Sequence, residues 1–427
     1  GFRIDTLKHV EHEFWQEFAP AIRKYVRSEE IPYGVRPLSV PKTNWFMFGE
    51  AFDGDDALLG EFTYNNEVDS VFYFSQKFQV YEDVVKCGGA TNKVDGLWNN
   101  RLRWNPGSAA THGPTRSCFP GRCFRTTTGV NPDGSPKGGT VPDPVAGQPI
   151  FNQNPVDLGP VDSAGNGVPP SKLLVNFLDN HDVARFMSPV VVCGKDQALA
   201  NDQLYGQSTL YRDLLRQRLH SAMALMFSQD GLPCIYYGTE QEFEGGNDPA
   251  NRERLFGTLV KNFYGGQANL QREPLWGSGY GQTGESFKWI AKLAAVRKKY
   301  EVLRRGDLRV TWASDRTGDE KDANVLAFVR TLSDRSALVV ANYKDPTQSG
   351  GALSMTDPPR ETSFNGQGMT LMNVPGMAPG TTLVDVLADP YDRTMESSYT
   401  VGADGRVIVR VSPRATKILV PQSQVQN

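Results

Sequence analysis

The first residues of the chain alternate between apolar and charged side chains, which is the pattern of a β-strand. Phe2 and Ile4 alternate with Arg3 and Asp5, so a short strand would place the arginine and the carboxylate on the same face. The residues that follow have a helical pattern. We therefore predict a strand over residues 1–5 that ends in a carboxylate just before a helix.

Two later apolar runs also end in acidic residues. Residues 44–49 are nearly all apolar and precede Glu50, and residues 173–178 lead into a segment that contains Asp182. Continuous apolar runs of this length are typical of parallel strands that are covered on both faces. In an α/β barrel, the groups at the C-terminal ends of such strands form the active site.

Helical patterns occur between and after these predicted strands. Over residues 10–27, apolar side chains recur at every fourth position, and Pro20 should kink this helix or begin a second one. Similar patterns predict helices over residues 211–227 and 285–305. Further apolar runs predict strands at residues 70–74 and 232–237.

Residues 88–170 differ from the rest of the chain in composition. Glycine, proline, asparagine and threonine dominate there, and no periodicity is visible. Because this stretch is far longer than an ordinary connection, we expect an insertion. Its expected place is the functional face of the α/β part, where βα loops carry such additions.

After residue 306 the helical signal ends. Short β-type runs separated by turn residues predict a small antiparallel β-sandwich. These runs lie at residues 325–329, 337–342, 382–386, 406–411 and 417–420. We therefore expect an α/β domain over residues 1–306 and an all-β domain over residues 307–427.

Composition excludes several classes of partner. The 427 residues are 39% hydrophobic and 22% charged, as in a soluble globular protein of two domains. A net charge of −3 argues against nucleic acid or an anionic membrane as the main partner. No apolar run approaches the roughly 20 residues that span a bilayer.

The five cysteines suggest two disulfides. Cys118 and Cys123 have a spacing that suits a small disulfide, and Cys87 and Cys193 lie in predicted loops and would pair if the fold brings them together. Cys234 lies in an apolar strand, where a small buried side chain is expected. Since CxxC pairs are absent, a zinc site is not expected. The pattern favours an oxidising, extracellular or periplasmic setting.

The three acids at strand ends suggest a reaction. Each of Asp5, Glu50 and Asp182, taken alone, would usually be a surface carboxylate that caps a helix. Three of them on one α/β unit, two beside an arginine or a histidine, favour glycosidic bond cleavage instead. That reaction needs an ionised carboxylate to attack the anomeric carbon and a protonated carboxyl to protonate the leaving oxygen. A further anion would stabilise an oxocarbenium-like transition state.

Several segments resemble signature segments of the α-amylase family of glycoside hydrolases. The three that carry the acids are GFRIDTLKH at residues 1–9, FGEA at residues 48–51 and FLDNHD at residues 177–182. Residues 231–240 resemble the last barrel strand of the family, and residues 247–252 resemble the loop after it. The resemblance implies an α/β fold with an incomplete (β/α)8 TIM barrel, strands four to eight, followed by a C-terminal antiparallel β-sandwich.

The resemblance also implies roles for individual residues. Asp5 would be the nucleophile, Glu50 the general acid/base and Asp182 the acid that stabilises the transition state. Arg3 would pair with the nucleophile and keep it ionised, and His181 would contact the same sugar ring. Glu50 must hold a proton, which calls for an apolar or anionic surround. A nucleophile and an acid/base about 5 Å apart would retain the α configuration.

Lys8 and His9 follow Asp5 by one helical turn. In the family, this pair lies near an acceptor subsite, and the main-chain carbonyl of the histidine binds a calcium ion. Calcium needs several oxygen ligands, and the others would come from parts of the barrel that precede this sequence. The acidic loop with aspartates at positions 53, 55 and 56 is expected to be solvated rather than an ion site.

The implied function is a retaining α-glucan hydrolase that cleaves α-1,4-glucosidic bonds in starch-like polysaccharides or maltooligosaccharides. An α-glucosidase or a transglycosylase on the same scaffold is an alternative, as is a non-catalytic amylase-like subunit that binds glycans. The first three barrel strands of the family and its inserted domain have no counterpart in the sequence. Because five strands cannot close a barrel, we expect a truncated sequence, or a second chain that supplies the N-terminal half.

Overall fold

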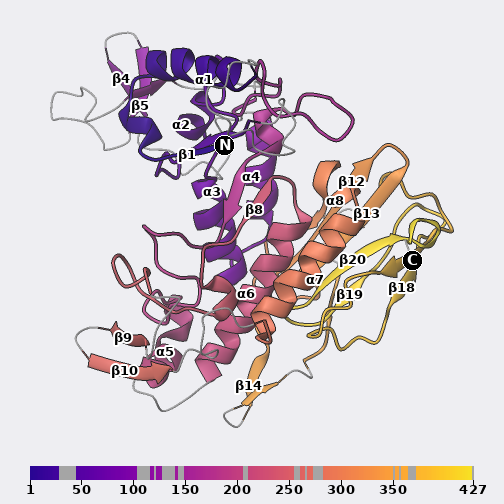
Figure 1. Cartoon of the computed structure of the whole chain (residues 1–427). Coiled ribbons are helices and arrows are strands. Elements are labelled where there is room, and N and C mark those ends of the chain that lie inside the picture. The colour runs from indigo at the N-terminus through magenta and orange to yellow at the C-terminus, as the bar shows by residue number, and fades with distance from the viewer. Residues whose placement is uncertain are drawn as a thin grey trace. The chain divides into compact units, whose positions relative to one another are not determined.

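The computed structural model describes two compact units of the chain (Figure 1). The first unit comprises Gly1–Phe78 and Val94–Asn176, and the second comprises Gln79–Lys93 and Phe177–Asn427. None of the helices in the described part of the chain is both long and apolar enough to cross a membrane. The described residues are 1–27, 45–102, 116–119, 122–126, 140–142, 149–204, 210–253, 260–264, 267–272, 282–349, 352–354, 357–363 and 372–425.

The first unit contains a parallel sheet in the order β1, β2, β3. These strands are Phe2–Ile4, Met47–Gly49 and Ser70–Val71. The register places Ile4 opposite Gly49, so Asp5 and Glu50 follow at the same end of the sheet. Gly49 has no room for a side chain, since a Cβ there would lie 2.4 Å from Leu7. Strands therefore form at the three places where the alternation over residues 1–5 and the two apolar runs predict them.

Helix α1 (His12–Arg27) follows β1, as its periodicity predicts. It is a single helix that contains Pro20, so a second helix does not begin there. Its buried Arg23 pairs with Asp69 at 2.9 Å and also donates to main-chain carbonyls at residues 66 and 67. This contact attaches the helix to the loop before β3.

The next helices are short. Helix α2 (Asp56–Glu61) begins at Asp55, whose side chain accepts a hydrogen bond from Ala57 N. After β3, α3 (Phe74–Gln76) continues into the π-helical segment η2 (Lys77–Lys86). The strand predicted to end at residue 74 is thus shorter than expected, and a helix follows it to residue 86.

Part of the stretch over residues 88–170 has regular structure that the composition does not suggest. Helix α4 (Asn92–Leu102) buries Val94, Leu97 and Trp98, three positions on one helical face. Trp98 Nε1 also donates to Gln76 Oε1 at 2.8 Å, which holds the helix in the first unit. Short elements follow: β4 (Arg116–Phe119), β5 (Arg122–Thr126), β6 (Thr140–Pro142) and η3 (Pro170–Lys172). The remainder of the predicted insertion between residues 103 and 148 lies outside the described residues.

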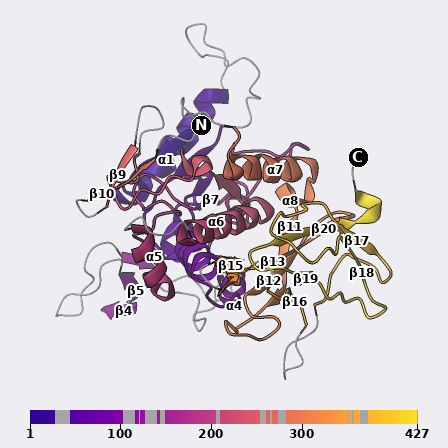
Figure 2. The ribbon, with the colours of Figure 1, turned by 90° about the horizontal axis from the view of Figure 1, so that it is seen from below.

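The chain enters the second unit through β7 (Val175–Phe177), whose first residue bridges to Phe72 in parallel. The predicted helices form α6 (Leu210–Ser228), α7 (Glu285–Lys299) and the short α8 (Val302–Arg305). Helices α6 and α7 lie side by side (Figures 1 and 2). The other elements here are η4 (Gly194–Asp196), α5 (Gln197–Leu204), β8 (Leu232–Cys234), η5 (Thr239–Gln241), β9 (Val260–Tyr264) and β10 (Gln267–Arg272).

The C-terminal part of the second unit is built on a six-stranded sheet, drawn in orange and yellow in Figure 2, in the order β11, β12, β13, β20, β17, β18. All its pairings are antiparallel. A two-stranded sheet of β16 and β19 adds to it, and the core holds residues such as Trp312, Val340, Val409 and Leu419. The strands are β11 (Asp307–Ala313), β12 (Val325–Leu332), β13 (Arg335–Asn342), β14 (Thr347–Ser349), β15 (Ala352–Ser354), β16 (Arg360–Glu361), β17 (Thr382–Asp385), β18 (Ser398–Thr400), β19 (Arg410–Val411) and β20 (Thr416–Pro421), followed by η6 (Gln422–Gln424).

Strand β12 is buried on both faces. Val325, Ala327 and Val329 point into the core of the sheet domain. On the other face, the fully buried Arg330 donates to three main-chain carbonyls, those of residues 228, 303 and 306. The sheet is therefore attached to the ends of α6 and α8 by a charged side chain.

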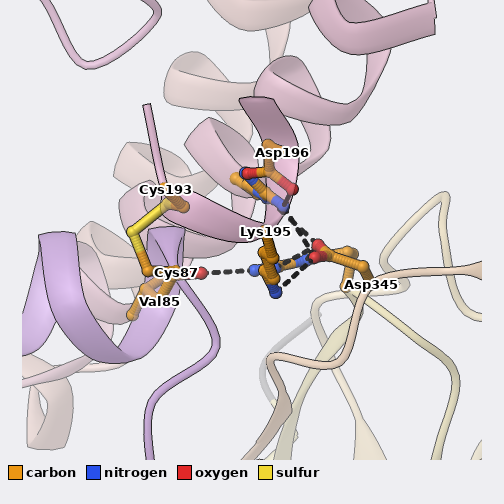
Figure 3. The surroundings of a disulfide bond; sticks show 8 residues. Val85, Cys87, Cys193, Lys195, Asp196 and Asp345 are labelled. Carbon is orange, nitrogen blue, oxygen red and sulfur yellow. Dashed lines mark hydrogen bonds and ion pairs between the residues drawn. A yellow bond between two sulfur atoms is a disulfide. The ribbon is translucent and has the colours of Figure 1, made fainter. Parts of the chain in front are cut away.

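The predicted disulfide between Cys87 and Cys193 is present and closes a separation of 106 residues. Beside it, Figure 3 shows Lys195 paired with Asp345, at 2.9 Å. The buried Arg218 and Arg414 also pair with Asp345. Arg414 in addition donates to Val85 O at 2.5 Å, so the segment before Cys87, helix α6 and the loops of the sheet domain meet at one charged cluster.

The two other cysteine predictions have different outcomes. Cys118 and Cys123 are register partners in β4 and β5, but their side chains lie outside the described residues. Cys234 is a free thiol that is partly rather than fully buried, and burial raises its pKa.

Candidate active site

In the first unit, Arg3 brings the two predicted catalytic carboxylates together. Its Nη1 donates to Asp5 Oδ2 at 2.7 Å, and its Nη2 pairs with Glu50 Oε2. A carboxylate oxygen of Asp5 and one of Glu50 lie within 4.8 Å of each other. The Asp5 side chain is 58% exposed, whereas that of Glu50 is 4% exposed, so the two acids have different environments.

The main chain fixes these side chains at adjacent strand ends. Glu50 N donates to Ile4 O at 2.8 Å, and Leu7 N donates to Glu50 O at 2.9 Å. Between them, Thr6 adopts a left-handed conformation with φ of 53°, which turns the chain directly after Asp5. The alternation of Arg3 and Asp5 in β1 thus places both side chains where the sequence predicts.

The surroundings of Glu50 differ from the expectation. An apolar or anionic surround was predicted for an acid that must hold a proton, but the guanidinium of Arg3 contacts Glu50 directly. The reason is geometric: Arg3 lies opposite Phe48 in the strand register, so its long side chain reaches the end of β2 as well as its own strand end. The Phe72 ring lies 6.0 Å from the same guanidinium. Glu50 is therefore buried but has a cationic neighbour.

Lys8 and His9 lie one turn beyond Asp5, in the segment η1 (Leu7–His9). Lys8 Nζ donates to Phe52 O at 2.5 Å and pairs with Asp53 Oδ2 at 3.4 Å. Lys8 therefore ties η1 to the loop after Glu50. The His9 side chain is exposed.

The acidic loop after Glu50 is not the solvated loop that was expected. Asp55 and Asp56 are buried, because Asp55 caps α2 and Asp56 accepts a hydrogen bond from Tyr73 Oη at 3.1 Å. Burial raises the pKa of Asp56 to about 7. These acids have structural partners, and the three aspartates of this loop are not arranged as a common ligand set.

In the second unit, His181 and Asp182 follow β7. His181 Nε2 lies 3.2 Å from Asp182 Oδ2, and Arg252 Nη2 lies 3.5 Å from Asp182 Oδ1. Asn180 shapes the turn, since its Oδ1 accepts hydrogen bonds from the main-chain nitrogens of Asp182 and Val183. Both predicted side chains are partly exposed, as groups that bind a ligand must be.

The other acid of the same segment, Asp179, has a purely structural position. Asp179 is buried; its Oδ1 accepts from Thr239 Oγ1 at 2.7 Å and its Oδ2 accepts from Phe186 N at 2.9 Å. Burial and hydrogen bonding therefore separate Asp179 from the partly exposed Asp182. The sequence does not predict the contact of Arg252 with Asp182. The only sequence signal for Arg252 is that it lies in residues 247–252, which resemble a loop of the family.

Comparison with known proteins gives the chain a family context. No family model matches the chain. Curated relatives include a beta/alpha-amylase of Paenibacillus polymyxa, 23% identical over 401 residues that cover 94% of this chain and 21% of that protein. An alpha-amylase of Streptomyces lividans is 23% identical over 424 residues, 98% of this chain and 33% of that protein. A cyclomaltodextrin glucanotransferase of Niallia circulans is 26% identical over 273 residues, 61% of this chain and 30% of that protein.

Solved structures agree on the fold. An Anoxybacillus alpha-amylase matches with a TM-score of 0.54 and 18% identity, covering 99% of this chain and 58% of that one. The alpha-amylase of Geobacillus thermoleovorans, solved with acarbose, matches with a TM-score of 0.52 and 16% identity over 98% of this chain and 59% of that one. The chain thus spans about a fifth to three fifths of the relatives that it matches.

These comparisons confirm the resemblance to the α-amylase family, whose members here are glycoside hydrolases and glucanotransferases. They also confirm the fold class, a TIM barrel protein with a C-terminal sheet domain. The absence of the first three barrel strands and the domain boundary at residue 306 stay predictions.

Proposed function

We propose that this chain carries the catalytic carboxylates of a retaining α-glucan hydrolase that cleaves α-1,4-glucosidic bonds in starch-like polysaccharides or maltooligosaccharides. The pair formed by Asp5 and Glu50 carries the proposal, because their oxygens lie within 4.8 Å of each other at adjacent strand ends. Retaining glycosidases have their two carboxyl groups about 5 Å apart, whereas inverting enzymes leave more room for a water.

Asp5 is the proposed nucleophile. Its carboxylate is the more exposed of the two and pairs with Arg3, whose charge favours the ionised form. In the first step, Asp5 attacks the anomeric carbon and the bond to the leaving oxygen breaks. The product of this step is a covalent glycosyl–enzyme ester.

Glu50 is the proposed general acid/base. In the first step it gives a proton to the leaving oxygen, and in the second step it takes a proton from the water that hydrolyses the ester. Burial and the nearby Asp5 carboxylate favour its protonated form, while contact with Arg3 favours the ionised form. These opposed influences suit a group that must change its protonation state twice in each cycle.

The remaining predicted residues would bind sugar. Asp182 and His181 present partly exposed polar groups that can accept and donate hydrogen bonds to sugar hydroxyls. Lys8, held against the loop after Glu50, would contact an acceptor unit of the glucan. These assignments follow the family resemblance and the exposure of each side chain.

The resemblance implies a calcium ion beside His9. The proposed ligand is the main-chain oxygen of His9, and calcium takes six to eight oxygens. In the described part of the chain, Asp53 contacts η1, but it is paired with Lys8. These residues do not complete a calcium site, so no step of the mechanism uses the ion.

The test uses the purified chain and a maltooligosaccharide with a chromogenic leaving group. We expect turnover in the wild type, turnover abolished by Glu50→Gln and Asp5→Asn, and a first-formed product of α configuration by proton NMR. Asn65→Ala serves as a matched polar control on the first unit, outside the site. Failure of the wild type to cleave, or equal turnover in Glu50→Gln, would refute the proposal.

Two alternatives are separated by the same assay. A transglycosylase is favoured by the relatives that are glucanotransferases, and it would give longer or cyclic products instead of free reducing ends. A non-catalytic glycan-binding subunit would bind the oligosaccharide without cleaving it. An α-glucosidase on the same scaffold would release only glucose.

The proposed setting is extracellular or periplasmic. The Cys87–Cys193 disulfide supports this, because disulfides persist in oxidising compartments. The proposed partner is an α-glucan, and the charge of −3 gives no support for nucleic acid.

A further inference from the structure

The segment that carries His181 and Asp182 is held by a second loop of the same unit. We call residues 179–186 the acid loop and residues 237–253 the support loop. Besides the contact of Asp179 with Thr239, three further buried side chains join them, and none of the three has a role in the proposed chemistry. They are Arg185 of the acid loop and Asn251 and Glu253 of the support loop.

Arg185 is the main charged link. It is 1% exposed, and its Nε donates to Glu253 Oε2 at 2.9 Å while its Nη1 donates to Tyr237 O at 2.6 Å. The guanidinium also lies 4.1 Å from the centre of the Tyr236 ring. A planar cation in this position makes directional contacts with a carboxylate, a carbonyl and an aromatic face at once.

Glu253, which pairs with Arg185, also binds the main chain of the support loop. Its Oε1 accepts hydrogen bonds from Glu244 N at 2.9 Å and Gly245 N at 2.7 Å. Arg185 N in turn donates to Gly245 O at 3.0 Å. Gly245 is closely packed, since a Cβ there would lie 2.0 Å from Ala250 O. The support loop therefore has little freedom to shift under the acid loop.

Asn251 binds the residues on either side of the two sugar-binding candidates. It is fully buried, and its Nδ2 donates to Asn180 O at 3.2 Å and to Val183 O at 2.9 Å. These carbonyls flank His181 and Asp182 on both sides. One amide group thus fixes both ends of the tetrapeptide that presents them.

We propose that Asn251, Arg185 and Glu253 are positioning residues that hold His181 and Asp182 in their binding geometry. This inference rests on the proposed function, because it assigns Asp182 to the transition state of sugar cleavage. A misplacement of about 1 Å in such a group can cost about 100-fold in rate. The three residues do not touch the sugar and act only through the acid loop.

The experiment compares Asn251→Ala and Arg185→Met with Arg330→Met. Arg330 is a matched control, because it is also buried in the second unit and donates to three main-chain carbonyls, at the base of the sheet domain. Two quantities are measured on the full chain: amide hydrogen exchange of residues 180–186, and kcat and KM on the chromogenic maltooligosaccharide.

We expect Asn251→Ala and Arg185→Met to speed exchange in the acid loop at least tenfold, with a 10- to 100-fold fall in kcat/KM. Arg330→Met should lower the melting temperature while it leaves exchange in the acid loop unchanged. If Arg185→Met does not fold, Asn251→Ala alone decides, since it removes one neutral side chain.

The two proposals fail in different ways. Absence of turnover in the wild type refutes the proposed function, and the exchange measurement still decides whether the acid loop is held as described. Unchanged exchange in Asn251→Ala overturns the positioning role. It is also overturned if Arg330→Met loosens the acid loop as much, because the loop would then respond to any loss of stability.

Discussion

The guanidinium of Arg3 on β1 forms an ion pair with the carboxylate of Glu50 at the end of β2. The same guanidinium pairs with Asp5, so a single cation neutralises part of the charge of two neighbouring acids. Two carboxylates within 4.8 Å of each other repel when both are ionised. Arg3 therefore affects which of the two carboxyl groups is ionised, and the proposed roles of Asp5 as nucleophile and Glu50 as acid/base depend on this.

Replacement of this cation should impair the proposed reaction strongly. We expect Arg3→Met to lower kcat by about 100-fold, comparable to the loss of one electrostatic donor in other enzymes. Because Asp5 would then be harder to ionise beside Glu50, the acidic limb of the pH–rate profile should move to higher pH. Lys8→Met, which removes a nearby cation that contacts neither acid, should leave that limb in place. An unshifted limb in Arg3→Met would contradict the assigned role.

Asp56 should make the protein less stable at neutral pH than at pH 4. Burial raises its pKa in the folded protein to about 7 from 3.8, so its stabilising contribution is complete below pH 4 and is lost as the pH rises towards 7. The loss amounts to about 1.4 kcal/mol for each pH unit between the two values. Asp56→Asn removes this dependence. Urea unfolding should therefore show that the variant gains stability relative to the wild type between pH 4 and pH 8; a constant difference would contradict it.

His220 should make the protein less stable in acid. Burial lowers its pKa to about 4 from 6.5, where it lies between Ser286 Oγ at 2.8 Å and Tyr391 Oη at 3.0 Å. Between pH 6.5 and pH 4 the unfolded chain binds a proton at this residue that the folded protein does not, so stability falls as the pH falls. His220→Gln should flatten this part of the stability profile, as measured by urea unfolding at half-unit intervals.

Loss of the Cys87–Cys193 disulfide should destabilise the second unit. The bond closes a separation of 106 residues, and removal of a native disulfide typically costs 2–5 kcal/mol. We expect the Cys87→Ala/Cys193→Ala variant to unfold at a lower denaturant concentration than the wild type. Dithiothreitol should shift the midpoint of the wild type towards that of the double variant. A wild type that is insensitive to the reductant would rule out this contribution.

The sequence predicts the strand ends of the first unit well because two local rules agree there. Alternation in β1 and an apolar run at β2 each define a strand, and parallel strands must present Asp5 and Glu50 at the same end. The C-terminal strands are also predictable, since turn residues separate their apolar runs. Strand β11 was missed because, as an exposed edge strand, it lacks a continuous apolar run.

The errors have a common physical cause, which is side chains whose environment depends on distant parts of the chain. The helix at α4 is not apparent from the sequence because its three buried apolar positions lie in a glycine-rich stretch, and one of them, Trp98, is fixed by a hydrogen bond to the distant Gln76. Asp55 and Asp56 belong to a loop of hydrophilic sequence, yet both are buried. Asp55 accepts a hydrogen bond from Ala57 N at the start of α2, and Asp56 accepts one from Tyr73 Oη. Arg185 and Asn251 carry no local signal, because their partners lie more than 50 residues away.

Because β12 is buried on both faces, few of its residues should tolerate substitution. A library randomised along Val325–Arg330 should recover hydrophobic residues at almost every position and arginine alone at 330, since neither face of the strand meets solvent. Its neighbour β11, in which Asp307 and Arg309 are exposed and Trp312 alone is buried, should instead accept polar replacements at the positions other than Trp312. Two adjacent strands of one sheet would thus accumulate substitutions at very different rates. The strand with the lower rate, β12, is the one that attaches the sheet to the helices.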